Sequence, residues 1–357
     1  MGSMTLSSII RRFGVVIAWI VIIIVFTILR SSTFFTVSNF TTILSSQAPL
    51  GILSLALLIP LAAGDYDLSV ASVLTLASMV TAILNVGHGV PIVWSVIIAI
   101  VVGGIVGLAN ALICIGFGID PFIVTLGMGT FIDGVTLWIS NSTPLSGISS
   151  GLTNIVVVFR AGDLSYEFYY FLVFAILIWY LFDYTPAGRR IQVVGKGREV
   201  ARLSGLNVKR IRLLAFVAAG ALSAVAGVVY LGTSGTADPS AGTSLLLPAF
   251  AAVFLGSTTI RPGRFNPWGT LVAVYFLTTG ITGLSLLGVS SFVQQLFYGG
   301  ALIISVALAS LGDRSPLKKL QRRRRDAVQE MVSDHRLAND AQGGVNEDSG
   351  QQLAEPD

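Results

Sequence analysis

Long apolar segments separated by short polar loops run through most of this chain, and they limit the folds that are open to it. A helix needs about 20 apolar residues to cross the hydrocarbon of a bilayer, and fewer where neighbouring helices shield a break. The chain contains ten such segments, although the eighth is short and the second and third nearly touch: 13–30, 48–63, 68–85, 90–114, 121–140, 168–184, 211–231, 245–257, 266–287 and 292–311. The pattern predicts an all-α polytopic membrane protein with about ten transmembrane helices.

Composition supports the same fold class. Of the 357 residues, 54% are hydrophobic and only 11% are charged, whereas soluble domains are about 25% charged. The first apolar stretch is too long for a signal peptide and lacks a small-residue cleavage site. His88 and His335 lie far apart in the sequence, and Cys114 has no second cysteine to pair with. We therefore expect no histidine-based metal site, no intrachain disulfide and no nucleic-acid partner.

The positive charges test the number of spans and their direction. With ten spans and a cytoplasmic N-terminus, Arg30 and Arg160 are the exceptions among 22 Lys and Arg residues, and all the others fall on the inside. Cytoplasmic loops carry such an excess of Lys and Arg. An odd number of spans would put one basic terminus on the wrong side, so we expect both termini to be cytoplasmic.

Two parts of the chain align with each other at an offset of 170 residues. The segment GIDPFIVTLGMG, from Gly118, matches GVSSFVQQLFYG, from Gly288, at two glycines, a phenylalanine and a leucine. A weaker alignment, at an offset of 179, places LSVASVLTLAS over LPAFAAVFLGS. Together the two alignments pair spans three to five with spans eight to ten, and an offset of five spans reverses orientation. The sequence thus predicts an inverted repeat, which favours a transporter over a membrane enzyme.

The basic segment GRRIQVVGKGREVARLSGLNVKRIR, residues 188–212, stands out in this apolar chain. Its Gly195-Lys196 pair does not form a phosphate-binding loop, because Gly188 lies too far upstream and Gly197 replaces the required hydroxyl residue. We therefore expect no nucleotide hydrolysis by this chain. A generic charge cluster and a docking surface remain open as interpretations.

Part of this segment, REVARLSG, is compatible with a short helix. Val200 and Leu203 can share one face, and Gly205 suits a left-handed C-terminal cap. The charged residues lie largely on other faces: Arg198, Glu199 and Arg202. A loop that only fixed the membrane orientation would need no amphipathic helix between two glycines. The docking interpretation therefore stands on a par with that of a generic charge cluster.

Several segments resemble the sugar-type permeases of bacterial ABC importers, which handle ribose, xylose, galactose and autoinducer-2. The resemblance covers about residues 36–311 and rests on four stretches: GDYDLSVASVLTL, TPAGRRIQVVGKGREVARLSGLNVKRIR, LLLPAFAAVFLGSTTIRPGRFNPWGTLVA and LLGVSSFVQQLFYGGALI. It implies a permease subunit in the bacterial cytoplasmic (inner) membrane that carries a small polar solute, most simply a sugar or polyol. The implied partners are ATPase subunits that use ATP and Mg²⁺, a second permease copy or paralogue, and an extracytoplasmic solute-binding protein.

In that family a short cytoplasmic helix seats in a cleft of the ATPase. Carried over to this chain, the matching positions are Glu199, Ala201, Ser204, Gly205 and Val208. The resemblance thus implies an ATPase-coupling segment of eight residues: Arg198, Glu199, Ala201, Arg202, Leu203, Ser204, Gly205 and Val208. No catalytic, cofactor-binding or metal-binding residue is implied for this chain.

Polar residues at membrane depth are costly and are usually functional. Asp65 and Asp67 lie where the second span breaks into the third, so they are candidates to cap that span or to contact solute. Asp120 precedes Pro121 and is expected to cap the fifth span. Candidate residues of the translocation pathway are Asp67, Ser69, Asn110, Asp133, Gln294 and Gln295. Helix-to-helix hydrogen bonds are the default interpretation for the amides. Gly103 and Gly107 predict close helix packing within the subunit.

We therefore expect a transmembrane permease domain over 1–311 and a disordered cytoplasmic tail over 312–357. The domain would contain two repeat halves, at about 13–140 and 168–311, and a cytoplasmic coupling loop at about 185–210. An ion-coupled secondary transporter is the alternative function, because it would also explain an inverted repeat. A membrane-embedded enzyme is disfavoured, because the sequence has no cluster of His, Cys or carboxylate residues.

Overall fold

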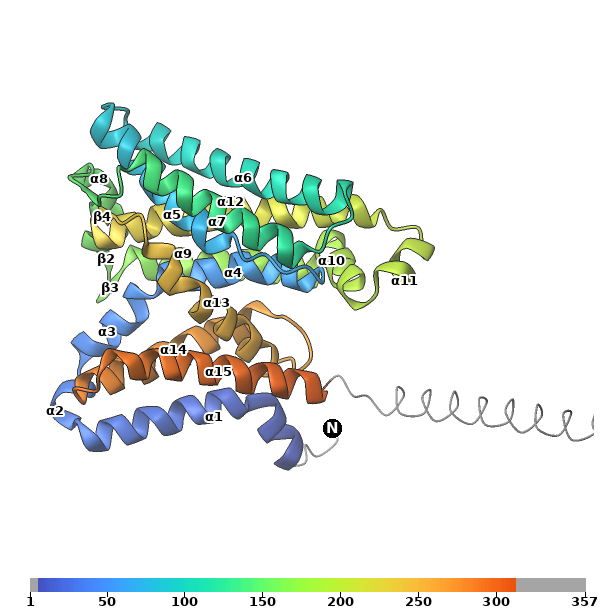
Figure 1. Ribbon diagram of the computed structural model, residues 1–357. Coiled ribbons are helices and arrows are strands. Elements are labelled where there is room, and N and C mark those ends of the chain that lie inside the picture. Colours follow the sequence, from blue (N-terminus) through green and yellow to red (C-terminus); the bar gives the residue numbers. More distant parts are fainter. Residues whose placement is uncertain (1–5, 313–357) are drawn as a thin grey trace, which may run out of the picture. The chain divides into compact units, whose positions relative to one another are not determined.

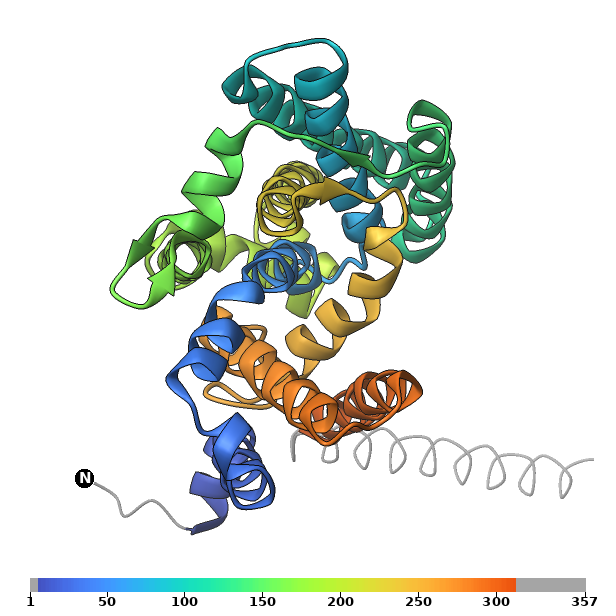
Figure 2. The same ribbon diagram turned by 90° about the vertical axis from the view of Figure 1, so that its left-hand side faces the viewer.

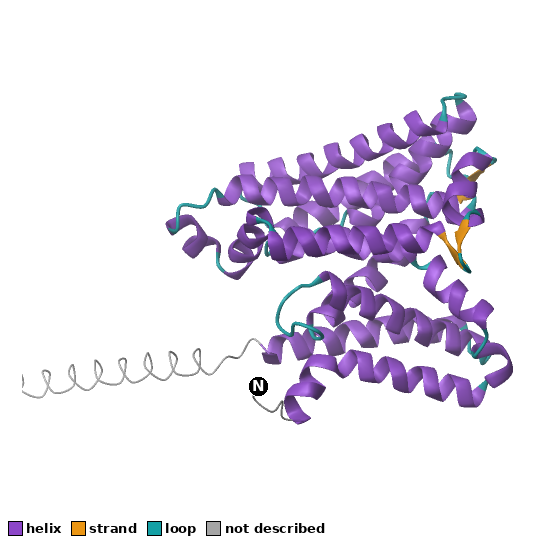
Figure 3. Ribbon diagram, turned by 180° about the vertical axis from the view of Figure 1, so that it is seen from behind, coloured by secondary structure: helices purple, strands orange, loops and turns teal. Residues whose placement is uncertain are grey.

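The computed structural model describes residues 6–312, and helices make up most of this part (Figures 1 and 3). The helices before residue 140 are α1 (Leu6–Leu29), α2 (Ser31–Phe34), α3 (Val37–Ser46), α4 (Ala48–Ala62), α5 (Val70–Ala82), η1 (Ile83–Gly87), α6 (Ile92–Gly116) and α7 (Pro121–Ile139). Those that follow are α8 (Ser150–Thr153), η2 (Asn154–Val158), α9 (Tyr166–Tyr184), α10 (Pro186–Lys196), α11 (Arg198–Leu203), α12 (Val208–Ser234), α13 (Ala241–Ser257), α14 (Pro267–Leu286) and α15 (Ser291–Gly312). Apart from Gly312, the predicted tail lies outside the described residues.

Within residues 6–312, nine helical segments are long and apolar enough to cross a membrane. The predicted eighth span corresponds to α13, which is apolar but has only 17 residues. The second span begins earlier than predicted, because α3 and α4 together form one segment, Val37–Ala62. The all-α polytopic fold is therefore confirmed. The start of α1, the end of α15 and helix α11 lie at the same end (Figure 1), and the cytoplasmic location of that end stays a prediction.

Helix boundaries repeat at the stronger of the two predicted offsets. Helix α7 begins at Pro121 and α15 begins 170 positions later, at Ser291; α6 ends at Gly116 and α14 ends 170 positions later, at Leu286. Gly118 and Gly288, which align in sequence, both have positive φ, of 69° and 75°. Helices α7 and α15 run in opposite directions in Figure 1, as an inverted repeat requires.

The weaker alignment, at an offset of 179, is wrong. Helix α5 begins at Val70 and α13 at Ala241, a shift of 171 positions. Apolar, glycine-rich helices match one another by chance at several registers, and only their ends reveal the correct one. The starts of α5 and α13 instead follow, to within one residue, the offset of the neighbouring helices.

Equivalent helices of the two halves pack against each other near the centre of the fold. Helix α4 contacts α12, and α5 contacts α13 (Figure 2). At the second contact, the backbone N–H of Gly242 donates a hydrogen bond to Thr75 Oγ1 at 2.8 Å. A Cβ atom on Gly242 would lie 2.2 Å from the carbonyl oxygen of Ala71, its repeat equivalent at an offset of 171. Contacts between equivalent positions are what a pseudo-two-fold axis between the halves produces.

Close backbone approach also joins α6 to α12. A Cβ atom on Gly103 would lie 2.5 Å from the Gly220 carbonyl oxygen, and one on Gly107 would lie 2.3 Å from that of Phe216. The prediction that these glycines pack helices within the subunit is therefore confirmed. Every residue of α4 is buried, so the core surrounds this helix, whereas α1 and α15 are mostly exposed.

Short strands lie at the end of the fold opposite α11 (Figure 1). Strand β1 (Leu145–Ser146) pairs with β4 (Thr236–Ala237), and β2 (Arg160–Ala161) pairs with β3 (Leu164–Ser165), both antiparallel. The first pair connects the two halves of the repeat. The second forms a hairpin that leads into α9.

Candidate functional site

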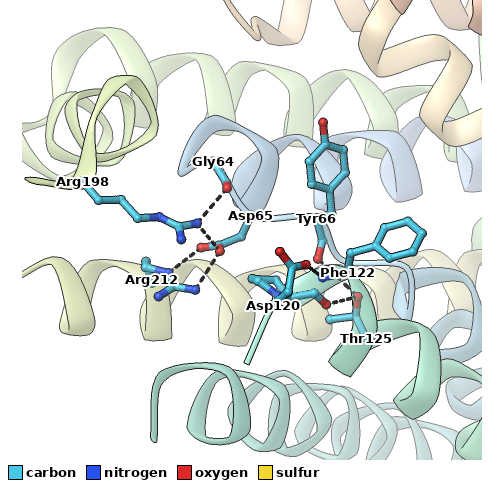
Figure 4. A network of polar contacts seen from close by, with 9 residues as sticks. Gly64, Asp65, Tyr66, Asp120, Phe122, Thr125, Arg198 and Arg212 are labelled. Carbon is cyan, nitrogen blue, oxygen red and sulfur yellow. Dashed lines mark hydrogen bonds and ion pairs between the residues drawn. The ribbon is translucent and has the colours of Figure 1, made fainter. Parts of the chain in front are cut away.

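The connection between α4 and α5, residues 63–69, is the centre of the polar contacts in the first half. Pro60 lies inside α4, and Gly64 has a φ of +80°, a conformation that glycine adopts without strain. The helix therefore ends, and the chain turns back toward the core in an irregular segment. Figure 4 shows how side chains from α7, α11 and α12 converge on this connection.

Asp65 is a buried carboxylate that is held by two arginines (Figure 4). Arg212, on α12, donates from Nε to Oδ2 and from Nη2 to Oδ1, both at 2.8 Å. Arg198, the first residue of α11, donates from Nη2 to Oδ1 at 2.5 Å and to the Gly64 carbonyl oxygen at 2.8 Å. The prediction that Asp65 caps the third span is wrong, because both carboxylate oxygens bind these arginines, whereas contact with solute stays a prediction. A buried carboxylate requires such compensation.

Three of the predicted pathway residues form one cluster next to this ion pair. Asp67 Oδ1 accepts hydrogen bonds from the Ser69 amide at 3.0 Å and from Ser69 Oγ at 2.6 Å. Asn110 on α6 donates from Nδ2 to Ser69 Oγ at 2.8 Å, as expected for a helix-to-helix bond. The buried Asn110 Oδ1 has no hydrogen-bond partner in the part of the chain that the structure describes. Burial raises the pKa of Asp67, which lies between the spanning helices, to about 6, although the bonds from Ser69 oppose this shift.

Thr125 on α7 fixes the backbone between these two carboxylates. Its hydroxyl lies 3.2 Å from the Tyr66 carbonyl oxygen and 3.0 Å from the Leu68 amide, which donates to it. At the start of α7, Asp120 Oδ1 accepts a hydrogen bond from the Phe122 amide at 2.8 Å. The predicted cap of the fifth span is thus confirmed.

The other three predicted pathway residues lie elsewhere. Asp133, on α7, is half-buried and lies within hydrogen-bonding reach of Ser72 on α5. Gln294, on α15, donates from Nε2 to Ser285 Oγ at the end of α14 at 3.1 Å, and the neighbouring Gln295 is exposed. The structure therefore brings Asp67, Ser69 and Asn110 together. It does not bring the glutamines to them.

The predicted short helix is present as α11, and its end has the expected cap. Gly205 has a φ of +79°. Its amide donates to the Arg202 carbonyl oxygen at 3.0 Å, and the Leu206 amide donates to that of Ala201 at 3.1 Å. This pair of bonds is the Schellman motif. Ser204, which lies between the last residue of α11 and Gly205, donates from Oγ to the Val200 carbonyl oxygen at 2.9 Å.

The faces of α11 differ strongly in burial. Ala201 is fully buried, whereas Val200 and Leu203 are 67% and 78% exposed. Glu199 accepts a hydrogen bond from Arg202 at 2.8 Å, with both side chains exposed. Half-buried Val208 begins α12. The helix therefore has one buried anchor and an uncovered apolar pair, which is the arrangement of a docking element.

The structure also explains the Gly-Lys pair and adds a helix that sequence reasoning missed. Thr185 caps α10, accepting a hydrogen bond from the Gly188 amide at 3.2 Å. A Cβ atom on Gly195 would lie 2.1 Å from the Ala62 carbonyl oxygen at the end of α4. Gly195 therefore serves close packing of two backbones and not phosphate binding. One sequence feature could have indicated helix α10 and the salt bridges of Asp65. Residues 188–212 are rich in basic side chains, and the chain offers few acidic residues with which they could pair.

Among the described residues, no group of three or more His, Cys, Asp or Glu side chains could hold a metal ion. The ion pairs of Asp65 can transmit movement between helices. Arg198 and Arg212 join α11 and α12 to one carboxylate, and this carboxylate lies two residues from the Asp67–Ser69–Asn110 cluster. Displacement of α11 would therefore act on a polar cluster inside the helix bundle.

Comparison with known proteins agrees with this geometry. A family model described as branched-chain amino acid transport system / permease component matches residues 39–306. The ribose import permease protein of Bacillus subtilis is 33% identical over 303 residues, covering 84% of this chain and 93% of that protein. The D-allose transport system permease protein of Escherichia coli is 29% identical over 300 residues, covering 84% and 92%. No solved structure matches the chain significantly.

A third relative, the autoinducer 2 import system permease protein of Photorhabdus laumondii, is 31% identical over 268 residues, covering 73% of this chain and 80% of that protein. The predicted resemblance to sugar-type ABC permeases is thus confirmed. The apolar helices and these bacterial relatives make the chain a multi-pass protein of the inner membrane. It is a translocation subunit and not an enzyme. The chain belongs to the family of permease components described for branched-chain amino acid transport systems.

Proposed function

We propose that this chain forms the translocation pathway of an ATP-driven, binding-protein-dependent importer for a sugar or polyol. Its relatives are named for import of ribose and autoinducer 2 and for transport of D-allose, and they match nearly the whole transmembrane region. The proposed partners are ATPase subunits that use ATP and Mg²⁺, a second permease copy or paralogue, an extracytoplasmic solute-binding protein and the bilayer. No cofactor is assigned to the chain itself.

The shared carboxylate of Asp65 is the observation that carries the coupling part of the proposal. It joins Arg198 at the start of α11 to Arg212 on α12 and to the connection before α5. A partner that pulls on α11 would thus move a buried charge, which tolerates little displacement from its counter-ions. Asn110 Oδ1, with its unfilled acceptor capacity, offers a hydroxyl-binding group on the route that such movement would open.

The uncovered pair Val200 and Leu203 supports α11 as the contact with the ATPase. The three residues after them close the helix in a rigid cap, so the pair is presented in one fixed orientation. Burying each side chain against a partner would contribute about 1.5–3 kcal/mol. The charged pair Glu199–Arg202 would form the polar rim of such an interface.

The test is purification of the tagged chain from gently solubilised native membranes, followed by mass spectrometry. We expect an ATPase subunit at near-stoichiometric yield. The double variant Val200→Ser, Leu203→Ser should lower this yield by at least about tenfold. Val193→Ser, at an exposed valine on the neighbouring helix α10, is the matched control and should retain the ATPase.

Two results would contradict the proposal in different ways. Recovery of the ATPase with the double variant would remove α11 as the docking element while leaving the importer intact. Recovery of the wild-type chain without any ATPase, together with uptake that depends on an ion gradient, would favour the secondary transporter and would direct attention to Asp133.

A further inference from the structure

A polar cavity lies at the end of the fold opposite α11. Its volume is about 200 Å³, and its lining comes from α3, η2, the β2–β3 hairpin, the start of α9 and the end of α12. Six of its ten lining residues are serine or threonine. The lining is therefore rich in hydroxyl groups, which can both donate and accept hydrogen bonds.

Glu167 in the first turn of α9 supplies the buried charge of this cavity. The residue is only 3% exposed. Its Oε1 accepts a hydrogen bond from Ser165 Oγ at 3.0 Å, and its Oε2 accepts one from Thr233 Oγ1 at 2.6 Å. Thr233 Oγ1 also lies 2.9 Å from the Val229 carbonyl oxygen, so the two acceptors share its single hydroxyl proton.

The carboxylate is thus incompletely satisfied by the protein. An ionised carboxyl group offers about four acceptor sites, and the bonds from Ser165 and Thr233 fill at most two of them. No ion pair to Glu167 occurs within residues 12–308, whose side chains the structure describes. The remaining acceptor sites face a polar space, and a buried charge needs hydrogen-bond donors there.

The other lining residues indicate which kind of molecule could donate these hydrogen bonds to Glu167. Arg160 and Asp163 are exposed and contribute one further donor and one further acceptor at the opening. Among the described lining residues, Val157 is the one apolar side chain. A molecule with several hydroxyl groups would therefore meet polar partners from α3, the β2–β3 hairpin and α9, and its carbon skeleton could pack on Val157 and on the carbon atoms of the lining side chains.

We propose that this cavity is a binding site for a small polyhydroxylated solute, with vicinal hydroxyl groups donating to the free acceptor sites of Glu167. The inference rests on the proposed function, and it assigns to this importer an outer reception site separate from the Asp67–Ser69–Asn110 cluster. Its place fits this role, because six of its ten lining residues lie within two loop segments, 141–167 and 232–244, at which a binding protein would deliver solute. We call these the outer segments.

The test uses the full-length chain in lipid nanodiscs and isothermal titration calorimetry with D-ribose, D-allose, D-fructose and L-leucine. We expect at least one of the sugars to bind and leucine not to bind. Glu167→Gln should weaken sugar binding by about tenfold or more, because the amide offers fewer acceptor sites. Asp238→Asn, at an exposed acid in the other outer segment, should leave it unchanged.

Thr42→Trp gives a second test, which does not require a substitution at the buried Glu167. Thr42 is an exposed lining residue, so tryptophan there should block the cavity without disturbing the fold, and thermal unfolding would verify this. Sugar binding that survives both substitutions would overturn the proposal, as would leucine binding in preference to every sugar, or no binding at all. Co-purification of the ATPase, measured separately, would then show whether the importer function stands without this site.

Discussion

The two halves of the repeat contain the same turn in different surroundings. Gly64-x-x-Asp67-x-Ser69 precedes α5, and Gly235-x-x-Asp238-x-Ser240 precedes α13. Both glycines have positive φ, of 80° and 70°. In both turns the aspartate Oδ1 accepts the amide hydrogen bond of the serine two residues on, at 3.0 Å and 2.8 Å. The local structure is therefore set by the motif itself.

Burial and partners separate the two turns. Asp67 is 1% exposed and belongs to a network that includes Asn110, whereas Asp238 is exposed. The residue after the glycine also differs between the turns. Asp65 binds two arginines, whereas the equivalent residue, Thr236, lies in strand β4 and pairs with Ser146 of β1. One turn is held by buried charge and the other by backbone pairing. The same motif thus serves as a connection to helix α11 in one half and as a surface link in the other.

The largest effect is expected at Asp65. Asp65→Ala leaves the mostly buried Arg212 without its counter-ion, and breaking such a pair costs about 3–5 kcal/mol. At the equivalent position, Thr236→Ala should cost less than about 1 kcal/mol, since its hydroxyl makes one exposed bond to Ser146. Thermal unfolding of both variants in detergent tests this difference. Equal losses would show that the buried charge does not distinguish the halves.

The contact between the halves should give the next largest effect. Gly242→Ala places a Cβ atom 2.2 Å from the Ala71 carbonyl oxygen, and the overlap should cost about 1–3 kcal/mol. Gly299→Ala, on α15 with no atom within 4 Å of the added Cβ, is the control and should be neutral or slightly stabilising. Unchanged stability of Gly242→Ala would mean that α5 and α13 separate easily.

The repeated aspartates should differ by a smaller amount. Asp67→Ala should cost about 2 kcal/mol, because the amide and the hydroxyl of Ser69 lose their buried acceptor. Asp238→Ala should cost about 1 kcal/mol or less, since water can replace the exposed bond. Unfolding temperatures at neutral pH would rank them. The reverse order would refute the importance of burial.

The buried turn should also respond to pH. Burial raises the pKa of Asp67 above its ordinary value, to about 6. The folded protein therefore keeps a proton that the unfolded chain releases, and the stability from Asp67 falls as pH rises from about 4 to about 6. The variant Asp67→Asn should lose this part of the pH dependence, whereas Asp238→Asn should keep it. A wild-type profile identical to that of Asp67→Asn would contradict the assignment.

The smallest effect on stability is expected at Glu199. Its bond to Arg202 is exposed, and such surface pairs contribute about 0–1 kcal/mol. Glu199→Ala should therefore unfold within a degree or two of the wild type, so any loss of ATPase recovery would report on docking alone. A large fall in unfolding temperature would instead make α11 part of the structural core.

Much of the fold could be predicted because the length and hydrophobicity of membrane helices identify them in the sequence. The repeat offset of 170, the caps by Asp120 and Gly205 and the helix 198–203 all follow from local patterns. The role of Asp65 could not be predicted, because a carboxylate before a helix looks like a cap, and its two arginines lie more than 130 positions away. The alignment of α5 with α13 was missed for a related reason: the turn that fixes it repeats three residues in six, which is too few to exceed chance similarity.

The contact of Ala71 with Gly242 bears on the origin of the molecule. Two identical five-helix chains, inserted in opposite directions and paired about a two-fold axis, would bring this position against its own copy. With alanine on both sides, the methyl group of one chain would overlap the carbonyl oxygen of the other, as the 2.2 Å approach at Gly242 shows. The present interface therefore excludes alanine on both sides, and joining the two halves in one chain allows Ala71 to face glycine.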